Sequence, residues 1–361
     1  MSDSAAREGR VLDRIAEFRQ RRPRLTETQV TLAHGAGGKA TAALVDAVFV
    51  EAFRNDLLAP LADSAVGSVP AGHRVAFTTD GYVVSPRRFP GASIGHLAVD
   101  GTVNDLAVMG AKPAWLTAGF IIEEGFAIDE LRAVVADMAE AAAAAGVAIV
   151  SGDTKVVPRG AADGLYITTA GVGFVPEDCR LDPAAVEPGD LVVVSGSIGD
   201  HGIAVIVARG DLAIEVDVRS DAAPLQDLIA GLLAVAPATR WLRDPTRGGL
   251  ATVCNELAAA TGLGIVLKES ALVIHPAVRA ACELLGLDPL HVANEGKVVA
   301  VVPADETDAA LAALRAHPLG AEAAVVGEVV ADPPRLVVLE TAFGGTRVVD
   351  VLVGDPLPRI C

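Results

Sequence analysis

The sequence has few aromatic residues and an excess of acidic over basic ones, and each imbalance excludes a class of structure or partner. Phe, Trp and Tyr make up 4% of its 361 residues, so the interior has to be built mainly from Ala, Val, Leu and Ile. The formal net charge of −17 at pH 7 repels phosphate backbones and anionic lipid head groups, which argues against nucleic acids and membrane surfaces as partners. A bound nucleotide would need a metal ion and backbone N–H groups to offset its charge.

Cysteine and long apolar runs are also scarce. The four cysteines, at positions 179, 254, 282 and 361, contain no CxxC pair and show no disulfide or zinc spacing, which suits a reducing cytosol. There is no apolar run of about 20 residues and no signal peptide. We therefore expect a cytoplasmic protein.

The composition that remains is globular, with 52% hydrophobic and 21% charged residues and with 36 Gly and 21 Pro scattered along the chain. The length suggests two domains of about 150 residues plus additional segments. Alternating strand-like and helix-like patterns predict mixed α/β (α+β) domains. The expected division is an Arg-rich N-terminal extension over 1–28, a first domain over 29–176, a second over 177–334, and a C-terminal segment over 335–361.

Hydrophobic periodicity predicts the elements. Helices are expected near 41–53, 93–109, 129–145, 224–235, 248–260, 276–286 and 305–316, with another after the turn at 196–202. Strands are expected near 75–80, 115–122, 147–150, 165–175, 191–195, 264–268, 297–302, 324–330, 335–340 and 347–350. Ser93 is the expected N-cap of its helix, and 179–189 is expected to be a linker.

Five acidic motifs are expected in loops or at the ends of elements, several of them beside glycine. They are Ala62-Asp63-Ser64, Thr79-Asp80-Gly81, Val103-Asn104-Asp105-Leu106, Gly152-Asp153-Thr154-Lys155 and Arg243-Asp244-Pro245-Thr246-Arg247-Gly248-Gly249. An Asp directly after an apolar strand is well placed to bind a hard cation, and Mg²⁺ takes one or two carboxylates plus phosphate oxygens. Taken singly, each Asp is more readily explained as a helix cap or turn former. The five together favour a site for a metal and a nucleotide.

Other polar motifs are less specific. The loop His34-Gly35-Ala36-Gly37-Gly38-Lys39 could present backbone N–H groups to phosphate. It matches neither GxxxxGKS/T nor GxGxxG, so a flexible turn is an equal alternative. Lys155 and Glu295 lie in glycine-bounded polar segments, where an ordinary surface side chain is the alternative. His201, beside Asp200, is interpreted as a structural turn residue rather than a metal ligand, and no GxSxG motif occurs.

The last eight residues end on a thiol. Pro356 and Pro358 stiffen the approach to Cys361, and Gly354 can act as a pivot. Eight extended residues reach about 25 Å. The segment is therefore interpreted either as a frayed terminus or as an arm that carries a sulfur-bound group to a pocket.

In this combination the motifs resemble the HypE family of hydrogenase maturation factors, carbamoyl dehydratases in the superfamily of aminoimidazole ribonucleotide synthetase and selenophosphate synthetase. The resemblance covers about 31–361. Its residues are Phe89-Pro90-Gly91, Gly101 to Ala107, Gly152 to Val156, Ile198 to Gly202, Arg243 to Ala251, Ala293 to Gly296 and Pro358 to Cys361. It implies a two-domain PurM-like fold with a flexible C-terminal tail, in which the N-terminal sheet pairs with that of a second subunit to form a dimeric barrel.

The resemblance also implies a reaction. A HypF-type carbamoyltransferase loads a carbamoyl group onto Cys361, and ATP-dependent dehydration converts it to a thiocyanate. The cyanide then passes to iron on a HypC–HypD complex, toward nickel–iron hydrogenase. Two other functions stay open: phosphorylation of a free small molecule with Cys361 incidental, and a nucleotide-binding scaffold without catalysis.

The resemblance assigns roles to individual residues. Mg²⁺ and phosphate are assigned to Asp63, Asp80, Asp105 and Asp244. The nucleotide is assigned to Gly35, Gly37, Gly38, Lys39, Asn104, Asp153, Thr154 and Arg247. Catalysis is assigned to Cys361, Lys155 and Glu295, where a buried Lys155 with a lowered pKa, deprotonated by Glu295, would act as the base.

Overall fold

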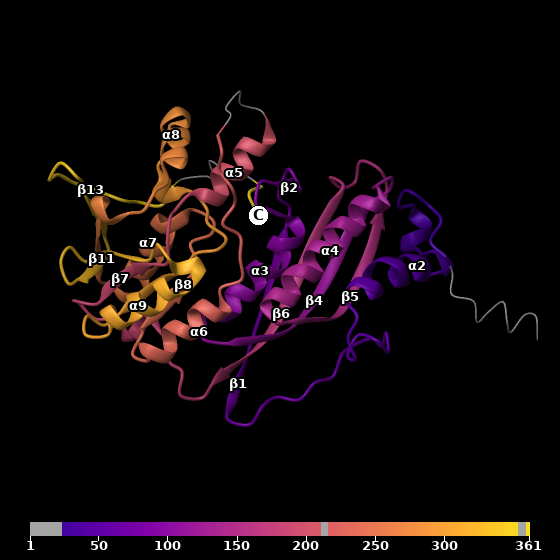
Figure 1. The fold of residues 1–361 in the computed structure, drawn as a ribbon, viewed down its shortest axis with the longest axis horizontal. Helices are drawn as coiled ribbons and strands as arrows, with labels where there is room; N and C mark the ends of the chain where they lie inside the picture. The colour runs from indigo at the N-terminus through magenta and orange to yellow at the C-terminus, as the bar shows by residue number, and fades with distance from the viewer. Residues whose placement is uncertain (1–23, 211–215, 353–358) are drawn as a thin grey trace, which may run out of the picture.

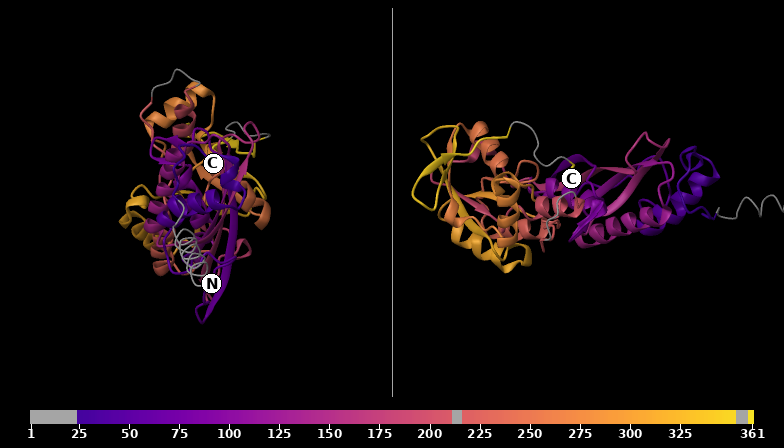
Figure 2. Two further views of the ribbon diagram at one scale, coloured as in Figure 1. Left: turned by 90° about the vertical axis from the view of Figure 1, so that its right-hand side faces the viewer. Right: turned by 90° about the horizontal axis from the view of Figure 1, so that it is seen from above.

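The computed structural model describes residues 24–210, 216–352 and 359–361, which form two halves side by side (Figure 1). Seen from above, the molecule is elongated, and the last residues lie between the halves (Figure 2). Most of the Arg-rich extension, over 1–23, and the expected pivot at Gly354 lie outside the described residues.

The first half is built on a sheet with the strand order β1-β6-β4-β5. Strand β6 is antiparallel to both of its neighbours, β1 and β4, whereas β4 and β5 are parallel. The helices α3 and α4 cover one face of this sheet (Figure 1). The bounds are η1 Leu32–Gly35, α2 Lys39–Leu44, the π-helix η2 Val45–Val50, β1 His73–Tyr82, β2 Arg88–Phe89, β3 Ala92–Ser93, α3 Ile94–Ala107, β4 Lys112–Glu123, α4 Ile128–Ala145, β5 Ala148–Val157 and β6 Leu165–Pro176.

The second half is built on a sheet with the strand order β13-β12-β9-β11-β7-β10-β8. The side chains of α6 and α9 pack on one face and those of α7 on the other, as the alternation of strands and helices predicts. The bounds are η3 Pro183–Ala185, β7 Leu191–Val194, α5 Asp200–Arg209, α6 Gln226–Val235, β8 Trp241–Arg243, α7 Gly249–Thr261, β9 Gly264–Lys268, η4 Glu269–Ala271, α8 Pro276–Leu285, η5 Pro289–His291, β10 Val299–Val302, α9 Thr307–Ala316, η6 Pro318–Gly320, β11 Ala324–Val330, β12 Val337–Glu340 and β13 Thr346–Val348.

Helix α3 lies at the centre of the molecule and is buried on nearly every side. Its start is the predicted one, because the Ser93 side chain accepts a hydrogen bond from the backbone N–H of Gly95. Gly95 lets α3 approach α4 closely, since an added Cβ would lie 2.4 Å from the carbonyl oxygen of Val134. Helices α5 and α8 contribute to the core of the first half, together with Ile360, so the two halves share buried surface.

The expected elements are found, with two differences that affect the site. Strand β1 continues to Tyr82 through its pairing with β6, so Asp80 lies inside a strand and not at its end. Strand β5 continues to Val157, so Gly152 to Lys155 is not a loop. Polar residues fit there because β5 is an edge strand with one face open to solvent. The sequence also did not predict β8. No helix in the described part of the chain is long and apolar enough to cross a membrane.

The close contact of α3 and α4 predicts opposite effects for two glycine substitutions. Gly95→Ala should lower the free energy of unfolding by about 2 kcal/mol, because the new methyl group overlaps the α4 backbone. Gly231→Ala, on an exposed position of α6 with no atom within 4 Å of the added Cβ, should raise it by about 0.5 kcal/mol. Denaturant unfolding of both variants checks this, and equal effects would contradict the packing described for α3.

Candidate active site

Four of the predicted acidic residues come together where the two halves meet. Asp80 lies in β1 and Asp105 in α3, and the hydroxyl of Thr78 donates a hydrogen bond of 2.9 Å to Asp105. Asp244 follows β8, and Glu295 precedes the adjacent strand β10. The charges of these carboxylates act on one another.

Burial of this cluster favours the protonated carboxyl groups. Burial raises the pKa of Asp244 to about 7, and the nearby Asp105 and Asp80 act in the same direction, partly opposed by Arg243. The pKa of Glu295 is raised well above its ordinary value, first by burial and then by the neighbouring carboxylates. The pKa of Asp105 is also raised by burial. Either protons or a bound cation would relieve this repulsion.

The cluster has donor atoms of the kind that Mg²⁺ requires. No three carboxylate, histidine or cysteine side chains in the described ranges are already arranged to hold a metal ion. The Oε1 atom of Glu295 is buried without a hydrogen-bond partner, and the charges of Asp244, Asp80 and Asp105 act on this carboxyl group. Because Mg²⁺ needs only one or two carboxylates when phosphate and water supply the rest, Asp80, Asp105 and Asp244 fit this ion.

Asn104, which the sequence assigns to the nucleotide, makes hydrogen bonds to the second half of the chain. Its Nδ2 atom donates hydrogen bonds of 3.1 Å to the carbonyl oxygens of Ala223 and Glu295, and its Oδ1 atom accepts one of 2.8 Å from the N–H of Leu225. These contacts use both hydrogens of the amide nitrogen and one of the two acceptor sites of its oxygen. In this structure Asn104 therefore fastens α3 to the second half and positions Glu295.

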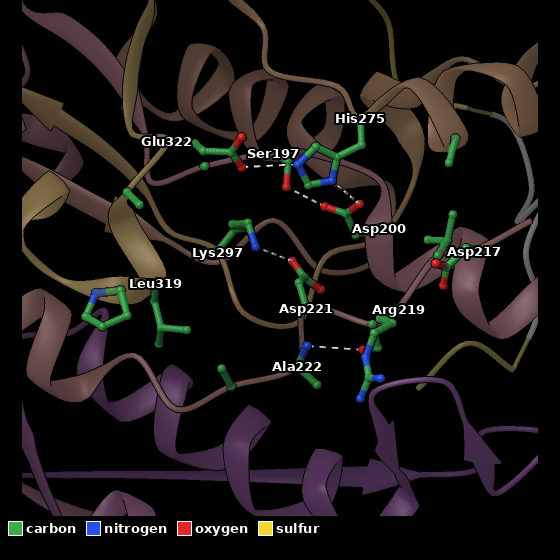
Figure 3. Close-up of a pocket in the computed structure, with 17 residues that line it drawn as sticks. Ser197, Asp200, Asp217, Arg219, Asp221, Ala222, His275, Lys297, Leu319 and Glu322 are labelled. Carbon is green, nitrogen blue, oxygen red and sulfur yellow. Dashed lines mark hydrogen bonds and ion pairs between the residues drawn. The ribbon is translucent and has the colours of Figure 1, made fainter.

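The backbone of Glu295 is held from a second side, at the edge of a cavity of about 460 Å³. Asp221 accepts a hydrogen bond of 3.0 Å from the N–H of Glu295 and forms an ion pair of 3.0 Å with Lys297. Figure 3 shows Lys297 and Asp221 directed toward each other in this cavity.

On another wall of the cavity, the His275 ring links Asp200 and Glu322 (Figure 3). Its Nδ1 atom lies 2.9 Å from Asp200 and its Nε2 atom 3.2 Å from Glu322. These contacts and the Lys297 ion pair occupy most of the charged side chains of the cavity. The ion pairs around the cavity therefore help to fix the segments that hold Glu295.

Other predicted residues lie on the open face of the first sheet. Asp153 lines a hollow there with Thr79. Because Thr79 and Asp80 are consecutive in a strand, their side chains point to opposite faces, so Asp153 and the carboxylate cluster are on different sides of the sheet. Asp63 is exposed and lines a neighbouring hollow. Thr154 lines a small apolar hollow under α2.

Lys155 is not the buried lysine that was expected. Its side chain is 65% exposed and forms an ion pair of 2.6 Å with Asp153, because both residues face the same side of β5. The ion pair lowers the pKa of Asp153. In the single chain, Lys155 thus belongs with Asp153 on the open face and not with Glu295.

The glycine-rich loop lies against β5. An added Cβ at Gly35 would come within 2.9 Å of Val156, next to Lys155. Gly37 has a φ of 80°, a backbone conformation that favours glycine, and with Gly38 and Lys39 it leads exposed into α2. Arg247 is also exposed, just before α7.

Cys361 lies between the two halves. Its carbonyl oxygen accepts a hydrogen bond of 3.1 Å from the N–H of Val83. Tyr82, the residue before Val83, is buried. Burial raises the pKa of its hydroxyl group, and the charges of the cluster at Asp80, Glu295 and Asp105 raise it further. Cys361 is thus hydrogen-bonded to the residue that follows Tyr82, on whose side chain the charges of the carboxylate cluster act.

Sequence reasoning missed several residues around these groups. None of the motifs described above contains Tyr82, Asp221 or Lys297. Lys297 lies two residues after Glu295, and in an extended segment this spacing places two side chains on the same side. His201 was interpreted as a turn residue, but it is buried in the first turn of α5. Its long-range contacts have no sequence signal.

Comparison with known proteins gives consistent matches along the chain. Residues 61–175 match the N-terminal domain of AIR synthase related proteins and residues 187–338 match the C-terminal domain. A carbamoyl dehydratase HypE of Cupriavidus necator is 52% identical over 342 residues, which are 95% of this chain and 97% of the relative.

Solved structures match as well. A crystal structure of a hydrogenase maturation protein HypE in complex with ATP has a TM-score of 0.88 and 44% identity, covering 92% of this chain and 99% of that one. A chain of a crystal structure of a HypE–HypF complex has a TM-score of 0.75 and 45% identity, covering 86% of this chain and 100% of that one.

The raised pKa of Asp244 predicts how Asp244→Asn changes stability with pH when no divalent cation is present. The folded pKa of about 7 lies above the ordinary 3.8, so the stabilising effect of the protonated group is complete below about pH 4 and is lost as the pH rises through 7. Because asparagine does not ionise, the variant should be the more stable protein at pH 8, by on the order of 3 kcal/mol.

Thermal unfolding between pH 4 and pH 8 measures this difference. Asp305→Asn, at an exposed position, is the matched control and should show little change with pH. A difference between Asp244→Asn and the parent protein that is the same at pH 4 and pH 8 would contradict the electrostatic account of the cluster.

Proposed function

Because this chain belongs to the HypE family of AIR synthase related proteins, we propose that it is an ATP-dependent carbamoyl dehydratase that acts on its own Cys361. The observation that carries the proposal is the position of Cys361. Its carbonyl oxygen is hydrogen-bonded to Val83, and the charges of the carboxylate cluster act on the adjacent Tyr82. A relative of this family binds ATP. The product would be a thiocyanate on the same sulfur, which provides cyanide for the iron of a hydrogenase.

The proposed reaction removes water from an S-carboxamide. The C–O bond breaks, the nitrogen loses two protons, and a C≡N bond forms. Oxygen is a poor leaving group, so the γ-phosphate of ATP becomes bonded to it and departs with it as phosphate, leaving ADP. Mg²⁺, when bound, would neutralise the phosphates and position them.

The residues of the chain have distinct proposed roles. Asp80, Asp105 and Asp244 would hold Mg²⁺, with Asp63 proposed as a further ligand. Glu295 is held in place through its backbone by Asn104 and Asp221, and its raised pKa makes its ionised form a better proton acceptor than an exposed glutamate.

The open face would supply the remaining groups. We propose that Asp153, Thr154, Arg247 and the backbone from Gly35 to Lys39 contact the nucleotide. Lys155 is proposed as the base that Glu295 deprotonates. Because the two residues lie on different sides of the sheet in one chain, this role requires that Lys155 leave its ion pair with Asp153 and meet the Glu295 of the second subunit in the proposed dimer.

The partners are proposed from the same family membership. A HypF-type carbamoyltransferase would load Cys361, in keeping with the HypE–HypF complex of a relative. A HypC–HypD complex would accept the cyanide. We also propose that the protein is cytoplasmic, that it forms a homodimer through the open face of its first sheet, and that its domains follow the expected boundaries at 29–176 and 177–334.

The proposed catalysis predicts that Glu295→Gln and Lys155→Ala block dehydration without blocking loading. Each variant should gain a carboxamide on the peptide that contains Cys361, because loading does not use these groups. Neither should then lose water on addition of ATP. Mass spectrometry of that peptide after incubation with a carbamoyl donor, the loading enzyme and Mg–ATP measures both steps.

Lys268→Ala, at an exposed lysine of β9, is the matched control and should dehydrate normally. Normal water loss in both active-site variants would remove Glu295 and Lys155 from the catalytic assignment. A Cys361→Ser protein that retains full ATP-dependent turnover would overturn the function itself and favour a small-molecule substrate. A loaded protein that releases no phosphate would favour a scaffold.

The proposed dimer predicts different effects for two exposed phenylalanines. Phe77 is 81% exposed on β1, at the edge of the first sheet, whereas Phe343 is 99% exposed after β12. Phe77→Glu should shift the protein from dimer to monomer, because it places a charge on the proposed interface. Phe343→Glu should leave the dimer intact. Light scattering measures the mass, and a parent protein that is monomeric at all concentrations would contradict the proposal.

A further inference from the structure

A second buried side-chain amide lies next to Glu295. Asn294 directly precedes that residue and is 0% exposed. Its Oδ1 atom accepts a hydrogen bond of 2.7 Å from the N–H of Gly199. Its Nδ2 atom donates hydrogen bonds of 3.0 Å to the carbonyl oxygens of Pro245 and Val292. Because an N–H only donates and a carbonyl only accepts, these three partners fix the orientation of the amide.

The contact with Pro245 reaches the segment that carries Asp244. The carbonyl oxygen of Pro245 accepts a second hydrogen bond, of 3.0 Å, from the backbone N–H of Asn294. The turn after Asp244 is closed by its own hydrogen bonds, from the N–H of Thr246 to the carbonyl oxygen of Asp244 and from the N–H of Gly249 to that of Thr246. Asn294 therefore holds a closed turn, through the residue that directly follows Asp244.

The same turn packs closely on the segment that leads to Asn294. Gly249 has a φ of 59°, and an added Cβ would lie 2.6 Å from the carbonyl oxygens of Leu290 and Val292. Because no side chain fits in this contact, the two backbones touch directly. The turn and the segment therefore form one packed unit, to which Asn294 adds two hydrogen bonds.

The third partner of the amide joins this unit to helix α5. Gly199 is the residue before α5, and its φ of 90° favours glycine. In the first turn of α5, the N–H of Gly202 donates a hydrogen bond of 3.1 Å to the carbonyl oxygen of Ala293. The N–H groups at the start of a helix have no partner within it, and Asn294 and Ala293 provide two.

Asparagine is the side chain that fits these partners. They require one acceptor and two donors at the end of a short side chain, and a primary amide supplies them. Aspartate would place a carboxylate against two carbonyl oxygens, and leucine would leave the buried N–H of Gly199 unpaired, which is costly. Because Asn294 is buried and its N–H groups are all used within the protein, it is not placed to contact a substrate.

The unit holds two acidic groups that act on each other. Asp244 is 6% and Glu295 3% exposed. After burial itself, the charge of Asp244 has the largest effect in raising the pKa of Glu295. Two buried acids in this relation favour a larger separation unless the main chain that carries them is restrained. The hydrogen bonds of Asn294 link their two segments directly.

We propose that Asn294 is a positioning residue that holds the carboxyl groups of Asp244 and Glu295 close together against their repulsion. Its hydrogen bonds go to main-chain groups beside these two residues, and none goes to a carboxyl group. Asn294 therefore sets the separation of the two acids without using the oxygen atoms that would do the chemistry.

The consequence for catalysis rests on the function proposed above, whereas the restraint itself does not. In that function Asp244 is a ligand of Mg²⁺ and Glu295 accepts a proton. Asn294 would keep the proton acceptor at a fixed distance from the metal-bound phosphates. Its loss would slow the chemical step, while Asp80 and Asp105 of the first half would still hold the nucleotide complex.

The restraint is tested by combining substitutions at pH 8 without nucleotide or divalent cations. Asp244→Asn should raise the thermal unfolding midpoint of the parent protein, because it removes a buried charge. In Asn294→Ala the two segments separate, so Asp244→Asn should raise the midpoint by about half as much or less. Hydrogen exchange at the Gly199 amide should become about tenfold faster in Asn294→Ala, because this amide loses its acceptor. Thermal unfolding and exchange followed by mass spectrometry measure the two effects.

Asn255→Ala is the matched control, since the Nδ2 atom of Asn255 in α7 also donates to two main-chain carbonyl oxygens, those of Ala251 and Val349. It should lower the midpoint but leave the effect of Asp244→Asn unchanged. Asn294→Ser, which keeps a smaller polar side chain, takes the place of Asn294→Ala if that variant does not fold. An effect of Asp244→Asn that is the same with and without the amide of Asn294 would contradict the proposal.

A readout of the reaction separates this proposal from the proposed function. In loaded Asn294→Ala, the rate of water loss at saturating Mg–ATP should fall about tenfold, with an apparent KM for ATP within about threefold of that of the parent protein. If the substitutions couple as expected but the parent protein forms no thiocyanate, the restraint stands and the proposed function fails. If the parent protein dehydrates its carboxamide and Asn294→Ala changes neither the coupling nor the rate, the function stands and the restraint fails.

Discussion

The hydrogen bonds of one buried amide hold the two halves of this molecule in register. Asn104 projects from α3 of the first half. Its side chain binds the main chain of the second half at Ala223, Leu225 and Glu295. An unpaired amide at this depth would be costly, so α3 and the second half fit together in one arrangement. That arrangement brings Glu295 and Asp244 to Asp80 and Asp105.

The carboxylate cluster is the electrostatic consequence of this junction. Burying several acidic groups together is unfavourable unless they take up protons or a cation, and the raised pKa values of Asp244 and Glu295 express this cost. The same arrangement is suited to a ligand that brings its own metal ion. The proposed Mg²⁺ would relieve this repulsion and would thereby stabilise the folded protein.

Most of the fold and part of the site could be predicted from the sequence. Periodicity located the long helices and strands, and the Ser93 cap was correct because it depends on neighbouring residues alone. Gly152 to Lys155 was misassigned, because glycine and charge favour a loop unless the pairing of β5 with β4 is known. The burial of Lys155 was also misjudged, since exposure depends on which face of the sheet is covered. The contacts of Asn104, His201 and Arg209 join distant segments and leave no local pattern.

The hydrogen bond between Val83 and Cys361 has a thermodynamic consequence, because both residues belong to the same chain. A segment of the same chain is present at a fixed effective concentration, whatever the concentration of the protein. Dilution therefore leaves this contact unchanged, whereas contacts with a second subunit or another protein weaken as the concentration falls.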